Sequence, residues 1–311
     1  MAKPEICYAI IDAASEPDIF SLLDEYNPPV CCLYSEPLQP EIAELAPYLV
    51  EVTDDVRKWL DARQTPWGIY VCTTVNMREL RHHLRKFTMV IIPDQEKPVF
   101  WRFYDPRNIW EILATFDDWR LHTFLGPVTK LETNLWGNKK SDRFEEQRKR
   151  YPEQANMSGI FLKFSQQQYD DINRIFINKY VEKIAVFLSR DLMYLNGLIS
   201  TEYTIADNVS KVIENNNIDI ISERKYIPEN IYSESEWVAK SLVEFLIENG
   251  ISDINSIGLI AYLLAYKKIR EFSSVPDEWH EILTQSGQPG YYKVNCLMLK
   301  EFGHIPAIYK G

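Results

Sequence analysis

Short apolar runs alternate with polar stretches through roughly the first 130 residues of the chain. The runs are rich in β-branched and aromatic side chains, which is typical of strands. Strands are therefore predicted at 6–11, 30–34, 48–52, 67–73, 88–92 and 99–104. The polar stretch 93–97 predicts a turn between the last two, and so a hairpin late in the order.

Helical periodicity occurs between these strands. Leu80, Leu84 and Phe87 stand at positions i, i+4 and i+7, which predicts an amphipathic helix over 77–87. A helix is predicted to start near Ser15, because the Ser-x-x-Asp pattern from Ser15 to Asp18 is typical of a helix N-cap. Other helices of this part are expected at 41–45, 54–62 and 108–116. Strands that alternate with helices predict a mixed α/β lobe around a central sheet.

From Ser165 onward the apolar positions recur with the period of a helix. Ile172, Phe176 and Tyr180 lie on one stripe of a long helix that is predicted over 166–193. Further helices are expected at 204–215, 235–249, 253–271, 276–284 and 289–301. No strand-like alternation competes with them, so this part is predicted to be an all-helical lobe.

A basic, polar segment separates the two parts. Lysine and arginine crowd here within an otherwise acidic protein, at Lys139, Lys140, Arg143, Arg148, Lys149 and Arg150. Such a segment is typical of a solvated linker, and an electrostatic docking strip is the alternative. The fold class is therefore predicted as α+β, with an α/β lobe over 1–136, a basic linker over 137–164 and a helical lobe over 165–311.

Composition narrows the class of protein. The chain is 46% hydrophobic and 25% charged, as in soluble globular proteins, and 13% of its residues are aromatic, which favours protein binding. A net charge of −11 argues against a nucleic-acid binder, because phosphate contacts need clustered Lys and Arg. The N-terminus lacks the apolar stretch of a signal peptide, and the longest apolar runs fall short of the ~20 residues that cross a bilayer. We expect a cytoplasmic protein without stable membrane insertion.

The pattern of cysteines also favours a cytosolic protein. The five cysteines form no C-x-x-C pair, and most stand in apolar runs: they are Cys7, Cys31, Cys32, Cys72 and Cys296. This is typical of reduced, buried thiols in the cytosol rather than of a disulfide framework. Cys31 and Cys32 point to opposite faces of a predicted strand, which disfavours joint metal ligation.

The sequence contains no recognisable catalytic constellation. His82 and His83 are adjacent on a predicted helix, about 100° apart, so they do not face one metal together. The chain has no G-x-S-x-G elbow, no phosphate-binding loop and no dinucleotide fingerprint. No catalytic residue, metal or cofactor is therefore expected. The alternative is a hydrolase that uses unrecognised carboxylates on the α/β core.

Residues 99–107 contain the densest group of aromatic and charged side chains in the sequence. On an extended strand Arg102 stands between Phe100 and Tyr104 on one face, which suits cation–π stacking or an ion pair. Asp105 then ends the strand and caps the next helix. Arg102 and Asp105 either pair internally and lock this junction, or the segment contacts a partner or takes part in catalysis. The candidate partner-binding residues are Trp101, Arg102, Tyr104, Asp105 and Arg107.

Six short motifs follow one another between Cys7 and Val128. They are Y-A-I-I-D-A-A at 8–14, A-P-Y-L-V at 46–50, P-W-G-I-Y at 66–70, H-L-R at 83–85, R-F-Y-D-P-R at 102–107 and L-G-P at 125–127. In their order and spacing they resemble the domain of unknown function 4123 (DUF4123), a family of type VI secretion effector chaperones and adaptors. The R-F-Y-D-P-R motif is the most specific of the six.

This resemblance implies a mixed α/β lobe followed by a more variable helical lobe. It also implies an adaptor that binds the N-terminal part of a toxic effector, its cargo, and helps attach it to a VgrG-type spike protein without itself being secreted. No catalytic residue comes with the resemblance, and the cargo is expected at the helical lobe or in a cleft between the lobes. The alternatives are an α/β hydrolase of unknown class and a structural component of the secretion apparatus.

Overall fold

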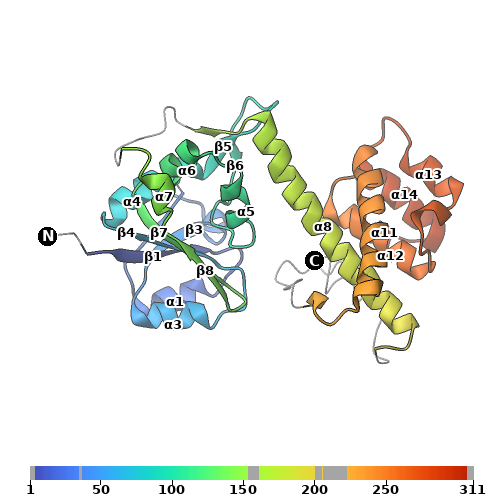
Figure 1. Ribbon diagram of the computed structural model, residues 1–311, viewed down its shortest axis with the longest axis horizontal. Coiled ribbons are helices and arrows are strands. Elements are labelled where there is room, and N and C mark those ends of the chain that lie inside the picture. The colour runs from blue at the N-terminus through green and yellow to red at the C-terminus, as the bar shows by residue number, and fades with distance from the viewer. Residues whose placement is uncertain (1–3, 35–36, 153–160, 200–204, 206–222, 307–311) are drawn as a thin grey trace. The chain divides into compact units, whose positions relative to one another are not determined.

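The computed structural model describes residues 4–34, 37–152, 161–199, 205 and 223–306 (Figure 1). The chain divides into two compact units, Met1–Asn173 and Arg174–Gly311, and the division falls inside helix α8 (Gln166–Leu195). The N-terminal unit is mixed α/β, and the described part of the C-terminal unit is mostly helical, which confirms the predicted fold class. The helix predicted over 204–215 lies outside the described residues except for position 205.

Within the described residues, a six-stranded antiparallel sheet forms the centre of the N-terminal unit, in the order β2-β3-β1-β4-β7-β8. The strands are β1 (Ile6–Asp12), β2 (Val30–Cys32), β3 (Pro47–Glu51), β4 (Gly68–Thr73), β7 (Val128–Leu135) and β8 (Asn138–Asp142). β1 lies between β3 and β4 and is buried on both faces, as its apolar run predicts. The strands predicted at 6–11, 48–52 and 67–73 are confirmed to within about two residues.

Helices cover both faces of this sheet (Figure 1). They are α1 (Ile19–Tyr26), α2 (Pro40–Ala43), α3 (Asp54–Asp61), α4 (Met77–Leu84), α5 (Ile109–Ala114), α6 (Asp118–Leu125) and α7 (Glu145–Arg148). On the face of α1 and α3, Ile11 and Tyr70 of the sheet join Leu22 and Leu60 of the helices in one buried cluster. α4, α5 and α6 lie on the other face. The sheet is therefore the middle of three layers.

Local sequence sets where these helices begin and end. The Asn76 side chain accepts from the Glu79 N–H at 3.0 Å and caps α4. α4 continues as a 3₁₀ turn, η1 (Arg85–Phe87), so the helix predicted over 77–87 is confirmed with a tighter last turn. α1 begins at Ile19, later than predicted, because the Ser15 hydroxyl donates to Asp12 Oδ2 at 2.9 Å and does not cap the helix.

Among the described residues, a second sheet has three short strands in the order β6-β5-β9. They are β5 (Met89–Ile91), β6 (Val99–Phe100) and β9 (Leu162–Lys163). β5 and β6 are antiparallel and form the predicted late hairpin. The prediction of a strand through 99–104 is wrong beyond Phe100, because the chain turns and the Asp105 N–H donates to the Arg102 carbonyl at 3.1 Å. The alternation of side chains predicted for this segment is therefore absent.

The basic segment predicted as a linker begins as an edge strand. β8 pairs with β7 over its whole length, and all five residues of β8 are exposed. A solvent-exposed edge strand carries charged residues, as a solvated linker does. Composition alone therefore does not distinguish an edge strand from a linker. Farther along, Arg148 Nη1 in α7 donates to the Gly126 carbonyl at 3.2 Å. Residues 138–148 therefore belong to the N-terminal unit, and the two units divide at Asn173, later than the predicted boundaries.

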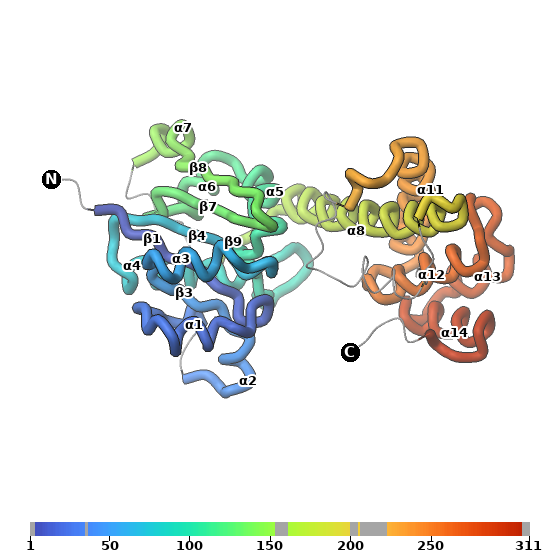
Figure 2. Tube along the Cα trace, turned by 90° about the horizontal axis from the view of Figure 1, so that it is seen from below, coloured from blue at the N-terminus to red at the C-terminus, as the bar shows by residue number. Residues whose placement is uncertain are grey.

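In the described part of the C-terminal unit, helices α11 to α14 follow α8 (Figure 2). They are α11 (Glu229–Glu248), α12 (Ile254–Tyr266), α13 (Asp277–Leu283) and α14 (Gly290–Phe302), with a 3₁₀ turn, η3 (Phe272–Ser274), between α12 and α13. Phe187 of α8, Leu242 of α11, Leu263 of α12 and Leu297 of α14 are fully buried in one core cluster. The helices predicted at 235–249, 253–271, 276–284 and 289–301 correspond to α11 to α14.

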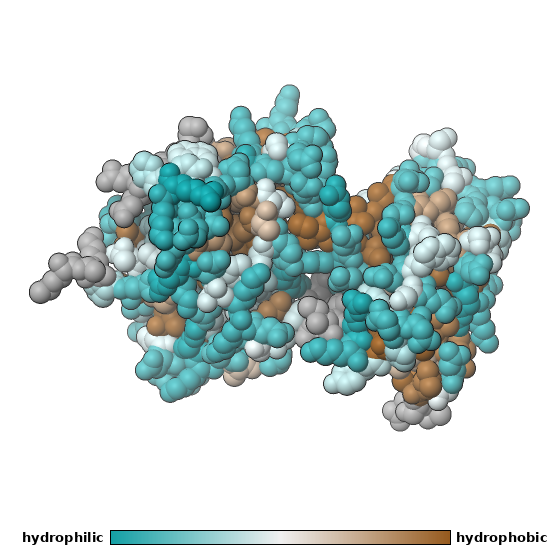
Figure 3. Space-filling view, in the orientation of Figure 1, coloured by the Kyte–Doolittle hydropathy of each residue, from teal (hydrophilic) through white to brown (hydrophobic). Residues whose placement is uncertain are grey.

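The apolar runs of the sequence are mainly inside the two units. The face of the molecule in Figure 3 is mostly hydrophilic, and hydrophobic side chains are visible there in small, separate areas. The exposed apolar side chains that remain are consequently of interest as contact points.

Candidate functional site

Asp12, at the end of β1, is a buried carboxylate with a partner distant in sequence. It is 5% exposed, and its Oδ2 atom lies 3.2 Å from Arg102 Nη2 and accepts from the Ser15 hydroxyl at 2.9 Å. Burial raises the pKa of Asp12, and Arg102 and Ser15 offset this rise only in part. Asp12 therefore depends on Arg102, because an unpaired buried charge is strongly destabilising.

The backbone around Asp12 brings further motifs together. The Asp12 N–H donates to the Trp67 carbonyl at 2.7 Å, and the Ala13 N–H donates to the Ala46 carbonyl at 3.2 Å. With the ion pair to Arg102, the motif at 8–14 thus contacts those at 46–50, 66–70 and 102–107.

Gly68 explains the glycine in the P-W-G-I-Y motif. Its φ is 150°, and a Cβ atom there would lie 1.8 Å from the carbonyl oxygen of Ile10 in β1. β4 approaches β1 at this point because Gly68 has no side chain. The motif glycine is thus a requirement of strand pairing.

The H-L-R and L-G-P motifs also contact each other. His83 Nε2 lies 2.7 Å from the Phe124 carbonyl oxygen, and a Cβ atom on Gly126 would lie 2.2 Å from His83 Cε1. Burial lowers the pKa of His83 to about 4. The ring is consequently neutral at pH 7, and its Nε2–H donates to the carbonyl.

Asp105 and Arg107 form a second ion pair, at the turn into α5. Asp105 Oδ1 accepts from the Arg107 N–H at 3.0 Å and from its Nε at 2.9 Å, and Oδ2 accepts from Nη2 at 2.7 Å. Asn108 Nδ2 also donates to Oδ2, at 3.2 Å. Both carboxylate oxygens are engaged, which holds the turn in one conformation. Instead of one pair between Arg102 and Asp105, the structure has two pairs, because Arg102 binds Asp12.

The five candidate partner-binding residues differ in exposure. Tyr104 is 1% exposed, and the half-buried Trp101 packs against four phenylalanine rings at centroid distances of 5.5 to 6.3 Å. Asp105 and Arg107 are mostly buried and bind each other. The Arg102 side chain is 46% exposed, the most of the five. This motif holds the fold together, and its role in binding a partner stays a prediction.

Residues 7–123 match the model of one protein family, described as Domain of unknown function (DUF4123). This segment is a DUF4123 domain. It runs from β1 into α6 and contains the first five of the six motifs. The resemblance predicted from the motifs is therefore confirmed over these residues. No curated protein and no solved structure matches the chain.

An open hollow of about 580 Å³ lies beside β8, outside the matched segment. It is lined by Lys130, Ser141, Asp142, Arg143, Glu145, Glu146 and Gln147. Asp12 and His83, whose pKa values are shifted by burial, are not part of this lining. Among the residues that the structure describes, no three His, Cys, Asp or Glu side chains are grouped as metal ligands. In the same residues no helix is long and apolar enough to cross a bilayer.

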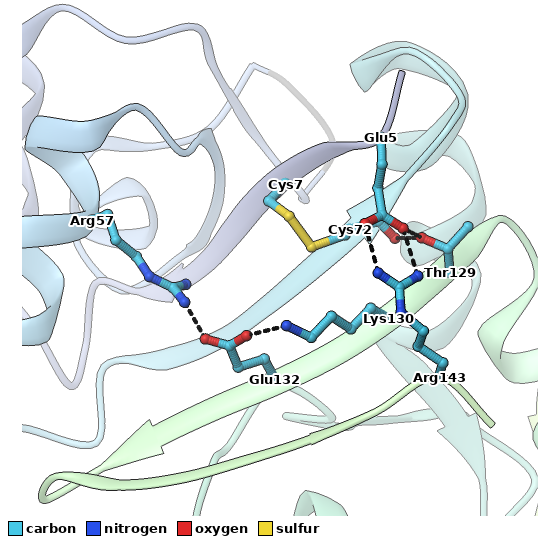
Figure 4. Close-up of a disulfide and its surroundings, with 8 residues drawn as sticks. All are labelled: Glu5, Cys7, Arg57, Cys72, Thr129, Lys130, Glu132 and Arg143. Atoms are coloured by element: carbon cyan, nitrogen blue, oxygen red, sulfur yellow. Dashed lines mark hydrogen bonds and ion pairs between the residues drawn. A yellow bond between two sulfur atoms is a disulfide. The ribbon is translucent and has the colours of Figure 1, made fainter. Parts of the chain in front are cut away.

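Cys7 and Cys72 form a disulfide bond between β1 and β4 of the DUF4123 domain (Figure 4). The two residues are directly opposite in the strand register, with Cα atoms 3.9 Å apart. The expectation that every cysteine is a thiol is therefore wrong for this pair, because the sequence does not reveal which strands are neighbours. Cys31, Cys32 and Cys296 are thiols.

Two charged clusters flank the disulfide (Figure 4). The Arg143 guanidinium donates to both carboxylate oxygens of Glu5 at 2.9 Å, and these bonds contribute most to a Glu5 pKa of about 2. Glu132 of β7 is bound by Arg57 of α3 and by Lys130, the latter at 2.6 Å. The clusters tie the start of β1 and helix α3 to the β7–β8 hairpin.

Sequence reasoning missed the central position of Asp12. The sequence did contain an indication, because Asp12 directly follows the apolar run 6–11 and a charged residue at the end of a buried strand requires a partner. That partner, Arg102, is 90 positions away, and the sequence alone did not bring the two together.

Proposed function

We propose that this protein is an adaptor that binds a type VI secretion effector, its cargo, and helps load it onto a VgrG-type spike protein. The observation that carries the proposal is the DUF4123 match over residues 7–123, in a family that the motif resemblance links to such adaptors. The adaptor acts in the cytoplasm, before the effector is exported, and binds the N-terminal part of that effector.

The polar side chains of the DUF4123 domain support a binding role over a catalytic one. The carboxylates of Asp12 and Asp105 are engaged by arginines, and the His83 ring is buried against Gly126, which follows the domain. Asp12 and His83, whose pKa values burial shifts, hold the fold, whereas a catalytic acid or base must reach its substrate. We therefore assign no chemical step to the protein. The adaptor stabilises the soluble state of its cargo by mass action.

Co-production with the products of the neighbouring genes tests this function. The tagged full-length protein is expected to co-purify with one effector and with a VgrG-type protein. An effector that lacks its N-terminal part is the matched control, and it is expected to be lost from the purified complex.

Recovery of neither an effector nor a spike protein would contradict the proposal. Sheath or baseplate proteins in a fixed ratio, with no effector, would instead favour a structural component of the apparatus. Turnover of a panel of ester and glycoside substrates by the purified protein would favour the hydrolase.

A further inference from the structure

The two edges of the six-stranded sheet differ in chemistry. β8, at one edge, carries the charged residues Lys139, Lys140 and Asp142, a pattern with which proteins protect an edge strand from pairing. β2, at the other edge, has the sequence Val-Cys-Cys and contains no Lys, Arg, Asp or Glu. β2 is therefore the edge whose own side chains carry no charge.

The backbone of β2 presents hydrogen-bonding groups away from β3. The Glu51 N–H donates to the Pro29 carbonyl and the Leu33 N–H to the Pro47 carbonyl, each at 2.9 Å. In an antiparallel pair, hydrogen-bonded positions alternate with positions whose groups point outward. The N–H and C=O of Val30, one residue after Pro29, consequently point outward.

At the other end of β2, backbone carbonyls that point away from β3 accept hydrogen bonds from Arg81 of α4. Its Nε donates to the Cys32 carbonyl at 2.6 Å, and its Nη2 donates to the Tyr34 carbonyl at 3.1 Å. The guanidinium thus takes acceptors that an added strand would use. An incoming strand would replace these donors with its own backbone N–H groups.

Exposed apolar side chains surround this edge. Tyr48 of β3 connects them, since its ring is 5.8 Å from that of Phe20 in α1 and its hydroxyl donates to the Ala43 carbonyl of α2 at 2.9 Å. The exposed side chains, which we name the β2 surface, are Phe20 (37% exposed), Val30 (40%), Ile42 (45%) and Leu45 (55%). Together they form an apolar area beside β2, where the backbone groups of Val30 point outward.

The helices α1 and α2 beside the β2 surface are acidic, whereas α4 brings the basic Arg81 to the far end of β2. Exposed carboxylates stand in α1 and α2 or directly after α2, at Asp24, Glu25, Glu41 and Glu44. Between Lys3 and Arg57 the chain contains no lysine or arginine. This charge favours a partner with basic side chains. Two copies that met through the same surface would bring like charges together.

Pairing of β2 with β8 of another copy is also disfavoured. The basic side chains at the β8 edge are engaged within their own unit: Lys139 with Asp61 at 3.1 Å, Lys140 over the Trp110 ring at 4.6 Å and Arg143 with Glu5 at 2.9 Å. Such head-to-tail pairing would also continue from copy to copy into a ring or an open filament.

We propose that the β2 surface binds an extended segment of a partner protein that combines β-branched apolar residues with lysine or arginine. The segment adds to the sheet as a strand along β2, its apolar side chains cover the β2 surface, and its basic side chains meet the carboxylates of α1 and α2. This proposal rests on the proposed function, since the effector is the partner that supplies the segment.

Fluorescence anisotropy with two labelled ten-residue peptides tests the proposal. One peptide alternates valine and lysine, and the other alternates valine and glutamate. The full-length protein is expected to bind the lysine peptide at least about tenfold more tightly, and the difference is expected to shrink as salt rises. No binding of the lysine peptide at concentrations up to about 1 mM would overturn the proposal.

Val30→Lys copies the charged protection of β8 and is expected to weaken binding of the lysine peptide about tenfold. Val30→Thr keeps an uncharged β-branched residue and is expected to bind as the unaltered protein does. Tyr291→Lys adds the same charge at an exposed position of the C-terminal unit and is expected to have no effect. Equal binding by Val30→Lys and the unaltered protein would overturn the proposal.

One further measurement distinguishes a partner segment from a second copy of the chain on the β2 surface. Another distinguishes failure of the β2 proposal from failure of the adaptor function. Sedimentation equilibrium that shows self-association abolished by Val30→Lys would replace the partner segment with a second copy. Effector recovery by the tagged Val30→Lys protein is expected to fall at least about tenfold. Undiminished recovery would leave the adaptor function standing and overturn the role of β2, whereas no recovery by the unaltered protein would contradict the adaptor function itself.

Discussion

Asp12 and His83 are buried polar side chains whose partners lie far away in the sequence. Arg102 binds the carboxylate of Asp12, and the Phe124 carbonyl accepts from His83. A polar group inside a protein is costly without such a partner, so each pair makes the fold depend on one arrangement of distant segments. At the residue scale the motifs are therefore first of all contacts that specify the DUF4123 fold.

Arg102→Ala is expected to lower the free energy of unfolding by about 3 kcal/mol, because it leaves the Asp12 carboxylate buried without its cation. Urea unfolding of the full chain measures this loss. The double variant Asp12→Asn/Arg102→Met removes both charges and is expected to lose less than Arg102→Ala alone. A larger loss in the double variant would mean that the charges are not the cause.

Acid is expected to destabilise the protein through His83. Its pKa is about 4 in the fold and 6.5 for an unperturbed histidine, so the unfolded chain takes up the proton first as the pH falls. This contribution to stability is complete above pH 6.5, is lost between pH 6.5 and pH 4, and has fallen by about 2 kcal/mol at pH 5.

Urea unfolding at pH 7 and pH 5 measures this loss. His83→Gln cannot titrate, so its stability is expected to change less between the two pH values, even where the substitution itself is destabilising. An equal change in both proteins would assign the acid sensitivity to other groups.

At the scale of elements, three kinds of contact hold strands β1 and β4 together. They pair along the centre of the sheet, Gly68 brings their backbones close, and Cys7 and Cys72 join them covalently. The cluster around Glu5 then attaches the chain just after β8 to the start of β1, and the cluster around Glu132 attaches β7 to helix α3. This part of the sheet is consequently expected to be the last to open.

Reduction of the Cys7–Cys72 disulfide is expected to lower stability by up to about 4 kcal/mol, because the bond joins residues separated by 65 positions and restricts the unfolded chain. Thermal unfolding with and without dithiothreitol measures the effect. The double variant Cys7→Ser/Cys72→Ser is the control and is expected to show no shift with the reductant. A shift of the same size in this variant would mean that the reductant acts elsewhere.

At the scale of the whole molecule, each of the two units has a buried core of its own. Leu242 is fully buried in the C-terminal core, and Ile10 is fully buried in the N-terminal unit. Substitution of either by alanine is expected to remove about 2 to 5 kcal/mol from its own unit. Separate cores therefore predict that the two units open separately.

Amide hydrogen exchange checks this prediction. Leu242→Ala is expected to speed exchange in α11, α12 and α14 and to leave β1 and β4 unchanged, and Ile10→Ala is expected to do the reverse. Acceleration of both units by both variants would show that they unfold as one.

Much of the element order was predictable, because helix and strand periodicities reflect the local geometry of the backbone. The candidate site was less predictable. The segment after Phe100 is β-rich in composition, yet the bonds of Asp105 to Arg107 and Asn108 turn it into a loop. A tertiary contact also moved the start of α1, because Ser15 binds Asp12 instead of capping the helix.

The sequence by itself determined an α/β part followed by a helical part and, through the order of its motifs, membership of residues 7–123 in the DUF4123 family. The tertiary structure alone decided that Asp12 meets Arg102, that Cys7 meets Cys72 and that the basic residues of β8 protect one sheet edge while β2 stays uncharged. These outcomes follow from the strand order, which depends on the packing of segments far apart in the chain and leaves no local pattern in the sequence.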